Sequence, residues 1–576
     1  MLWLESTVSA TEYWANAERS RFAGQHESDI LGTREIPDVR KSLELEVEAV
    51  GLVMSSLRTR LNSLTSVNRL APEILAYIFS LLRADDPPLA DYENSNNGSS
   101  SPSGVLGWIQ VTHVCRHWRT VALDHSVLWS DIMFHVLGSE WTKEFFRHSG
   151  TAPIVLKVLP LRDRDLYHEY MYRLAIFLEQ HLSHTKELCV EEIRQDFMPF
   201  IDLLRNPAPL LETLVLHNQV GPEHEGIDDI PSLPPDLSAP RLRHLSLERC
   251  RFPWAARSFQ SLIHLDIVQN RENGAVHGPL SAPDYAAEIE RILDALAGMP
   301  SLEVLTLEDV FPPPPRNTTP QSLQVHAVSL VKLRRFYITD DIGNCGLVLK
   351  HINSPSSTEY RIHGTDIDWG CDSLTLWLAT IFMSRSIRIL YIRSNQIAVT
   401  NHMSKDAKVF FPEHHDDNTH PFRLILTGPS RRPVPSVSQL QSICQSFPMG
   451  GLEAIFALDN DDCSARDWTI LFGRYTDVCH VTAQSINGIH LCEQLMAPSE
   501  EHTQPLFPSL ASLRLLSIDF NRELGFRDRL LEWLQVRNRG APLKRLIIGE
   551  SRIDGILVDR LRAVVSELEW DGDEGR

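Results

Sequence analysis

Residues 242–250 are LRHLSLERC, and residues 262–270 are LIHLDIVQN. In both stretches leucine or isoleucine occupies the first, fourth and sixth positions. The last two of these apolar residues are therefore separated by a single residue. Successive side chains of a β-strand point to opposite faces, and this alternation therefore predicts a short strand with one buried face. The two stretches predict two strands that bury the same side.

The same LxxLxL pattern recurs along most of the remaining chain. Such recurrence is typical of a leucine-rich repeat, in which each unit adds one short strand to a curved parallel sheet and buries its leucines between neighbours. The copies starting at 242, 262, 302 and 333 are unevenly spaced. A regular leucine-rich-repeat array has one copy about every 20–29 residues. We therefore expect an irregular repeat domain over residues 181–570. The further copies are LETLVLHN (211–218), LEVLTLEDV (302–310) and IRILYIRSN (387–395), with weaker ones at LRRFYITD (333–340), LRLLSIDF (513–520) and LKRLIIGE (543–550).

Residues 36–66 carry apolar residues at a heptad period, after a polar stretch (1–35) that we expect to be a disordered arm. Steps of four and three residues place the apolar set on one stripe of a single helix. Two interpretations remain open, a coiled-coil seam or a long helix that packs its stripe on the next domain. The stripe consists of Leu43, Val47, Val50, Met54, Leu57, Leu61 and Leu64.

Residues 67–135 combine two helical patterns with an insert. The first, VNRLAPEILAYIFSLL (67–82), has Pro72 where a first helical turn tolerates proline. A second apolar stripe includes Val111, Val114, Cys115, Trp118, Val121 and Ala122, and the stretch closes with Leu128 and Trp129. Between them, residues 83–104 are acidic and then rich in Asn, Ser, Pro and Gly, which predicts a flexible insert.

LAPEILAYIFSLL followed by WIQVTHVCRHWRTVALDHSVLWSDI resembles the F-box, in the form common in mushroom-type fungi, where a heptad helix often precedes it. The resemblance extends through WTKEFFRHSGTAPIVLKV, in what we expect to be a connecting segment (136–180). It implies an α+β or α/β solenoid protein with a heptad helix, an all-helical F-box and C-terminal leucine-rich repeats. It also implies a non-catalytic receptor subunit of an SCF-type ubiquitin ligase, bound to a Skp-type adaptor and through it to cullin and RING subunits.

The resemblance assigns adaptor binding to a set of large apolar side chains of the kind that dominate interface energy. We expect about half of them, including Trp118, to hold the box together instead, because amphipathic helices bury one stripe in their own core. The set is Leu70, Pro72, Ile74, Leu75, Ile78, Phe79, Val114, Trp118, Leu128 and Trp129.

The open face of the predicted sheet is a second candidate surface, for an unknown protein target. Residues that alternate with the inward leucines form two outward columns. The first column is Thr213, His244, His264, Val304, Arg335 and Ile389, and the second is Val215, Ser246, Asp266, Thr306, Tyr337 and Tyr391. From these we select His244, His264, Asp266, Arg335, Tyr337 and Tyr391 as target-binding candidates.

The composition favours an intracellular protein-binding protein, cytoplasmic or nuclear. Of 576 residues, 43% are hydrophobic, and 75 acidic against 55 basic residues give a formal charge of -20, which disfavours nucleic-acid and membrane partners. Nine scattered cysteines indicate reduced thiols. The start shows no secretory-signal pattern, and the longest apolar run, LTLWLATIFM (374–383), is too short to span a bilayer.

The common catalytic motifs are absent, so we expect no enzyme activity, no cofactor and no metal. The segment 414–420, HHDDNTH, is expected to be a solvated loop, since paired Cys and His ligands are missing. The alternative to a ubiquitin-ligase subunit is a leucine-rich-repeat interaction scaffold that takes no part in ubiquitination. Binding to a Skp-type adaptor separates the two.

Overall fold

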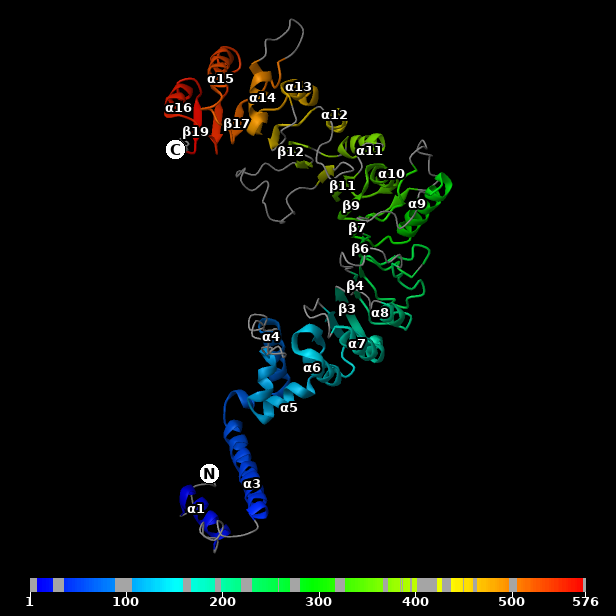
Figure 1. Ribbon diagram of the computed structural model, residues 1–576, viewed down its shortest axis with the longest axis vertical. Coiled ribbons are helices and arrows are strands. Elements are labelled where there is room, and N and C mark those ends of the chain that lie inside the picture. Colours follow the sequence, from blue (N-terminus) through cyan, green and yellow to red (C-terminus); the bar gives the residue numbers. More distant parts are fainter. Residues whose placement is uncertain are drawn as a thin grey trace. The chain divides into compact units, whose positions relative to one another are not determined.

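The computed structural model (Figure 1) separates into two compact units. The helical unit comprises Met1–Trp129 and Lys143–Gly150, and the sheet unit comprises Ser130–Thr142 and Thr151–Arg576. The residues that the structure describes are 8–23, 36–88, 106–158, 167–191, 198–218, 230–256, 258–269, 280–315, 327–365, 371–383, 385, 387–393, 396–400, 422–426, 437–448, 450–458, 464–496 and 505–572.

The helical unit begins with a helix where we predicted a disordered arm. Residues Ala10–Arg21 form α1, so the prediction is wrong there, while residues 1–7 and 24–35 lie outside the described residues. A capping box explains the helix. The Glu12 amide donates to Ser9 Oγ at 3.2 Å, and the Ser9 amide donates to Glu12 Oε2 at 3.0 Å, so two otherwise unpaired donors of the first turn are satisfied.

The heptad stretch forms one 28-residue helix, α3 (Ile36–Ser63), as predicted. Its stripe is not packed on the described residues of this unit. The apolar side chains from Leu43 to Leu64 that make up the stripe are all exposed, from 37% at Leu43 to 74% at Leu64. The second interpretation, a stripe buried on the next domain, therefore does not describe this helix.

The segment that follows α3 is built from short helices. The helix predicted over residues 67–82 is shifted: Pro72 begins α4, after a separate 3-10 turn, and α4 continues to Asp85 in what we predicted to be the insert. The second predicted stripe is not one helix, because Cys115 is extended (φ -157°, ψ 168°) between two helices. These elements are η1 (Val67–Arg69), α4 (Pro72–Asp85), η3 (Gly107–His113), α5 (Arg116–Asp124), η4 (Ser126–Trp129) and the end of α6 (Phe134–Ser149).

Among the described residues, the sheet unit contains a large sheet of 17 strands, nearly all parallel. From β1 to β11 the strands pair in chain order, except that β8 (Val328–Ser329) and β10 (Ile352–Asn353) form a separate pair. The strands are β1 (Asp131–Met133), β2 (Ile154–Val158), β3 (Thr185–Glu191), β4 (Thr213–His217), β5 (His244–Glu248), β6 (His264–Val268), β7 (Val304–Glu308), β9 (Arg335–Asp341), β11 (Glu359–Thr365), β12 (Ile389–Arg393), β13 (Gln396–Thr400), β14 (Phe422–Leu426), β15 (Ala454–Leu458), β16 (His480–Gln484), β17 (Ser512–Leu516), β18 (Arg545–Gly549) and β19 (Glu567–Trp570).

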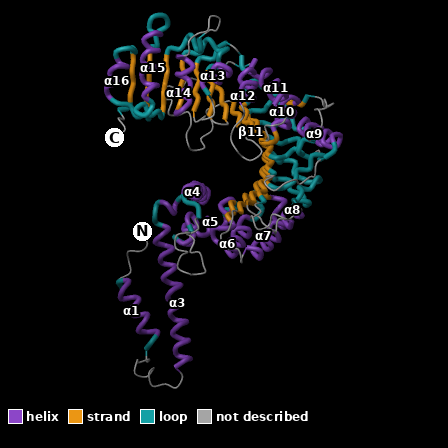
Figure 2. The backbone as a smooth tube through the Cα atoms, turned by 45° about the horizontal axis from the view of Figure 1, so that its top comes forward, coloured by secondary structure: helices purple, strands orange, loops and turns teal. Residues whose placement is uncertain are grey.

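Helices cover one side of this sheet. Figure 2 shows its strands as a curved row with the helices along the outer side. Successive helices from α10 to α16 contact one another. The leucines of the LxxLxL copies, such as Leu245, Leu265 and Leu305, are 0–1% exposed between these layers. The helices are α7 (Tyr167–His181), α8 (Met198–Leu203), α9 (Ala282–Ala297), α10 (Ile342–His351), α11 (Cys371–Met383), α12 (Val437–Ser446), α13 (Ala465–Phe472), α14 (Ser485–Met496), α15 (Leu524–Arg537) and α16 (Gly555–Arg562).

The chain order of the sheet is interrupted once, between β11 and β15. Strand β14 pairs in parallel with β11, β12 pairs in parallel with β15, and β13 lies antiparallel between β14 and β12. The register crosses the interruption without a slip, since Tyr360 faces Phe422, Phe422 faces Val399, and Val399 faces Leu390. The column of inward side chains is therefore continuous.

The same backbone turn follows several strands. The residue directly after the strand has a positive φ of 50–55° after five strands, although none of these residues is glycine. At one of them, the Arg249 amide donates to the carbonyl of Val268 on the next strand at 2.8 Å. Recurrence of an uncommon conformation at one position indicates a repeated structural unit. The five are Arg249, Asp309, Ser485, Ser517 and Glu550.

Two predicted boundaries need correction. The connecting segment 136–180 is part of the sheet unit beyond α6, because β2 pairs with both β1 and β3, so the sheet begins at Asp131 and the box is not entirely helical. The copy predicted at 513–520 is in the wrong frame. Leu513 pairs with Leu546, which is the second leucine of its own LxxLxL copy. Leu513 is therefore also a second leucine, and its copy starts three residues earlier, at Leu510.

Candidate protein-docking surfaces

Helix α4 has two apolar faces. One face is buried in the helical unit through Leu75, Ala76 and Phe79, which are 0–2% exposed. The opposite face is also apolar but remains exposed, with Ile74 at 51% and Tyr77 at 63%. A helix whose apolar residues extend beyond one buried face is expected to bury the remaining ones against a further surface. Among the described residues of this unit, none covers the exposed side of α4. We call Ile74, Tyr77, Ile78, Leu81 and Leu82 the α4 face.

Packing on the buried side fixes the orientation of α4. The ring of Phe79 lies 5.3 Å from the ring of Trp118, centroid to centroid. The Trp118 indole N–H donates to Asn68 Oδ1 at 2.6 Å, and Asn68 Nδ2 donates to the carbonyl of Asn62 at 2.7 Å. Trp118 thus ties α5 to the segment before α4, as expected for a residue that holds the box together.

A cluster of aromatic rings forms the centre of the unit. Trp129 lies 5.2 Å from Trp108 and 5.1 Å from Phe145, in edge-to-face arrangements. Its indole N–H donates to the carbonyl of Ala122 at 2.7 Å, and its ring lies 4.9 Å from that of His148. Edge-to-face aromatic pairs add to the free energy gained from burial alone. The last turns of α6 therefore belong to the core of this unit.

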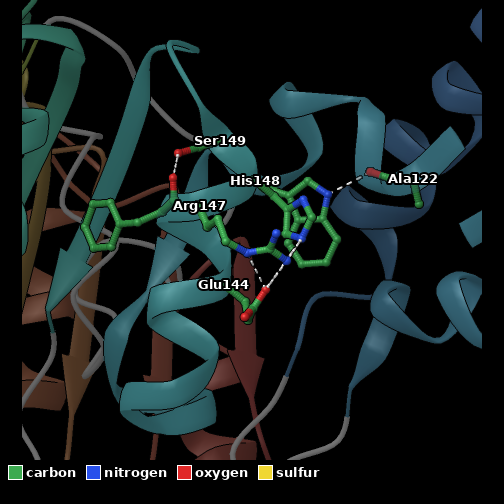
Figure 3. A network of polar contacts seen from close by, with 7 residues as sticks. Ala122, Glu144, Arg147, His148 and Ser149 are labelled. Atoms are coloured by element: carbon green, nitrogen blue, oxygen red, sulfur yellow. Dashed lines mark hydrogen bonds and ion pairs between the residues drawn. The ribbon is translucent and has the colours of Figure 1, made fainter. Parts of the chain in front are cut away.

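A polar network borders the cluster (Figure 3). Arg147 Nε donates to Glu144 Oε2 at 2.9 Å, and Arg147 Nη2 donates to His148 Nε2 at 2.6 Å. Because a guanidinium can only donate, His148 accepts through an unprotonated nitrogen. The pKa of His148 is lowered below its ordinary value, mainly by burial and secondly by the positive charge of Arg147. The neutral imidazole is the form that fits this site.

The two ends of the insert are held together. The Trp108 amide donates to the carbonyl of Asp86 at 2.8 Å. Gly107 has φ +52°, and a Cβ on it would lie 2.6 Å from that same carbonyl, so glycine is required. Residues 89–105 lie outside the described residues. The described residues on either side of this segment are joined by the hydrogen bond between Asp86 and Trp108.

The predicted adaptor-binding residues divide by exposure. Leu75, Phe79, Leu128 and Trp129 are 0–2% exposed and belong to the core. Leu70 and Trp118 are half-buried, whereas Pro72, Ile74, Ile78 and Val114 are exposed. Tyr77, Leu81 and Leu82 are exposed as well but were not among the predicted residues. The apolar residues of α4 extend beyond one face of the helix, and this was the signal that could have found them.

On the sheet, the register brings the predicted columns together from β4 to β9. Thr213, His244, His264, Val304 and Arg335 are successive partners, as are Val215, Ser246, Asp266, Thr306 and Tyr337. The rings of His244 and His264 lie 6.0 Å apart. Tyr337 continues this polar surface, since the Arg361 guanidinium carbon lies 4.8 Å from its ring centroid. These aromatic and charged groups suit recognition of a protein surface.

One predicted target-binding residue is not on the surface. Tyr391 is 0% exposed, and its ring stacks on Phe456 at 4.6 Å. Ile389, Ala398 and Ala454 pack with it in a small core. The prediction is wrong here because β12 and its neighbour β13 are buried on both faces, and alternation cannot tell inward from outward in such strands.

Ser246, His217 and Asp266 form a hydrogen-bonded array on the sheet face. Ser246 Oγ donates to Asp266 Oδ2 at 3.0 Å, and His217 Nε2 lies 3.0 Å from Ser246 Oγ. A nucleophilic serine needs the histidine between it and the carboxylate, so that the base is oriented by the acid. Here the serine is in the middle, and the array joins three strands without forming a catalytic triad.

The described parts of the chain contain no group of three or more His, Cys, Asp or Glu side chains placed to hold a metal ion. They contain no helix both long and apolar enough to cross a membrane. The segment 414–420, considered above as a possible metal-binding loop, lies outside the described residues.

Comparison with protein families gives one match. Residues 68–135 match the family model described as F-box-like. The chain contains an F-box-like domain. The match spans η1 to β1, so the F-box-like domain includes α4 and its exposed face. Among curated proteins, no match is found.

Proposed function

We propose that the chain is the non-catalytic substrate-recognition subunit of an SCF-type cullin–RING ubiquitin ligase, of the fungal F-box-like type. Its F-box-like domain would bind a Skp-type adaptor, and through it the cullin and RING subunits, while the sheet unit holds a protein target. The observation that carries this proposal is the exposed apolar α4 face inside the segment that matches the F-box-like model. Catalysis belongs to the partner subunits.

The α4 face has the properties of a docking surface. Its five side chains lie on adjacent turns of one helix, and each is at least 37% exposed. A contiguous apolar patch of this size on a protein surface is unusual unless a partner covers it. Large apolar side chains at the centre of an interface supply much of its binding energy. We assign adaptor contact to this face and to the exposed Pro72 and Val114.

Co-purification with a Skp-type adaptor tests this assignment. The double variant Ile78→Asp/Leu81→Asp should lose adaptor binding while the chain keeps its melting temperature, because both side chains are exposed in the free protein and a carboxylate desolvated in an interface has no partner. Ile556→Asp is the matched control, since Ile556 is 75% exposed on α16. Unchanged capture by the double variant would place the docking face elsewhere. Absence of capture by the wild type would favour the scaffold alternative.

We assign target binding to the sheet unit, interpreted as an irregular leucine-rich-repeat solenoid. Parallel strands in register, buried leucines at matching positions and the recurring left-handed residue support this interpretation. The remaining target-binding candidates lie on one face of the sheet, on three strands of the run β5, β6, β7 and β9. They are His244 on β5, His264 and Asp266 on β6, and Arg335 and Tyr337 on β9. Alanine at His264 and Tyr337 should reduce capture of the target and leave adaptor binding intact, because the two surfaces lie on different units. An unchanged set of bound proteins would contradict the assignment.

A further inference from the structure

Helix α3 exposes a complete heptad seam. The a positions are Val47, Met54 and Leu61, and the d positions are Leu43, Val50 and Leu57. All six side chains are at least 37% exposed. The side facing away from the seam is rich in serine, and one of these, Ser55, accepts a hydrogen bond from Arg116 Nη2 of α5 at 3.2 Å. This contact with α5 lies on the side away from the seam, and the apolar seam itself stays exposed.

The charges that flank the seam are divided between its two ends. Acidic residues occupy the e and g positions of the first half, Glu44 and Glu46. Basic residues occupy the same positions two heptads later, Arg58 and Arg60. In coiled coils the e and g residues determine the choice and orientation of the partner. Two copies of this helix that run in opposite directions would therefore place the acidic end of each beside the basic end of the other.

We propose that α3 binds α3 of a second copy of the chain as an antiparallel two-stranded coiled coil. A two-fold interface is self-complementary, so each contact occurs twice. Antiparallel pairing centred near residue 52 matches every a residue with a d residue, and all the resulting layers are apolar. The layers pair Leu43 with Leu61, Val47 with Leu57 and Val50 with Met54 of the second copy.

The flanking charges match only in this orientation. With the same centre, the e residues Glu44 and Arg58 face each other, as do the g residues Glu46 and Arg60. The uncharged Gly51 and Val53 then meet their own copies at the centre. In a parallel pair, each g residue faces the e residue five positions later on the other helix. Each charged residue would then face Val39, Gly51, Val53 or Thr65, without an opposite charge.

Among the described residues, two ion pairs within the chain involve the flanking glutamates. On α3 itself, Arg40 Nε donates to Glu44 Oε1 at 2.9 Å. Arg21 of α1 forms an ion pair with Glu46, with its Nε 3.0 Å from Glu46 Oε1. Helix α1 does not cover the seam, since Val47 and Val50 remain 73% and 63% exposed beside that pair. Arg60 of the second copy would take the place of Arg21 on Glu46. The Arg21→Ala variant should therefore still dimerise.

Charge exchange tests both the association and its direction on the full chain. The basic variant Glu44→Arg/Glu46→Arg carries four basic flanking residues, and the acidic variant Arg58→Glu/Arg60→Glu carries four acidic ones. Sedimentation equilibrium should show that the wild type is a dimer and that the two variants form a heterodimer when mixed. Each variant alone should self-associate roughly tenfold to a hundredfold more weakly than the wild type. The reason is that each surface ion pair contributes a small free energy of association, and four such pairs add. Homodimers that persist in both variants would exclude the antiparallel arrangement, and a monomeric wild type would overturn the proposal.

A matched pair of substitutions separates the seam from the helix itself. Leu57→Lys places a charge in the seam, whereas Leu52→Lys places it on the outer side of the helix, at a side chain 66% exposed. Circular dichroism should show unchanged helix content for both, since lysine is a good helix former. Only Leu57→Lys should give a monomer. Equal loss of the dimer in both variants would mean that the heptad seam is not the interface.

Discussion

Truncation of two neighbouring residues of α4 should have different effects: truncation of Phe79 should reduce stability, and truncation of Ile78 should reduce adaptor binding. Phe79 is 1% exposed and packs against Trp118 at 5.3 Å. Phe79→Ala removes a whole buried ring and leaves one face of Trp118 without contact, which should cost about 3–5 kcal/mol. Ile78 is 41% exposed, so Ile78→Ala should cost well under about 1 kcal/mol, as surface substitutions do. A charge at both positions together would confuse loss of binding with loss of folding.

Hydrogen exchange of the full chain measures both effects locally. A domain has only about 5–15 kcal/mol of stability, so Phe79→Ala should accelerate amide exchange strongly across α4 and α5, while the sheet unit is unchanged. Ile78→Ala should exchange like the wild type and bind the adaptor more weakly. The assignment of the two faces would be refuted if the Ile78 variant were the less stable one, or if the Phe79 variant exchanged normally.

Three further outcomes are expected. Replacing residues 89–105 with a short Gly/Ser linker should leave melting and adaptor binding unchanged, because the ends meet at Asp86 and closure entropy changes by only about 0.6 kcal/mol for each doubling of loop length; a lost complex would place the insert in the interface. Leu265→Ala, at a fully buried position, should cost about 2–5 kcal/mol in denaturant unfolding, and wild-type stability would contradict its inward placement. Since the pKa of His148 is lowered in the folded state, its unfolded state binds more protons, and the stability of the F-box-like domain should be constant well above pH 6.5 and fall as the pH drops through 6.5 toward the lower folded pKa. Local hydrogen exchange should show this dependence, and His148→Gln should flatten it; an equally steep dependence in the variant would assign it to other groups.

Sequence patterns predict the structure correctly where the chemistry of single residues determines the local conformation or burial. The proline at Pro72 marks the start of α4, and the leucines of β4 to β7 identify inward positions, because both depend on local chemistry alone. The patterns fail where tertiary contacts decide. Strand β16 carries Val481 and Ala483 at the leucine positions and was not predicted, although its neighbours hold it in register.

The candidate surfaces divide in the same way. The apolar residues of α4 could be named from the sequence, but which of them face the core depends on Trp118, which arrives from α5. Tyr391 seemed outward by alternation, yet Phe456 of β15 covers it. No local pattern contains that information, since β12 and β15 are brought together only by the reversed order of the strands between them.

That reversed order makes part of the sheet removable in principle. Strand β12 runs parallel to β11, because two antiparallel pairings, β14 with β13 and β13 with β12, restore the direction. Through the same partners, Tyr360 is aligned with Leu390. A chain without β13 and β14 could therefore join β11 directly to β12 with unchanged direction and register. The two strands therefore lengthen the sheet while the strands on either side of them keep a common direction and register.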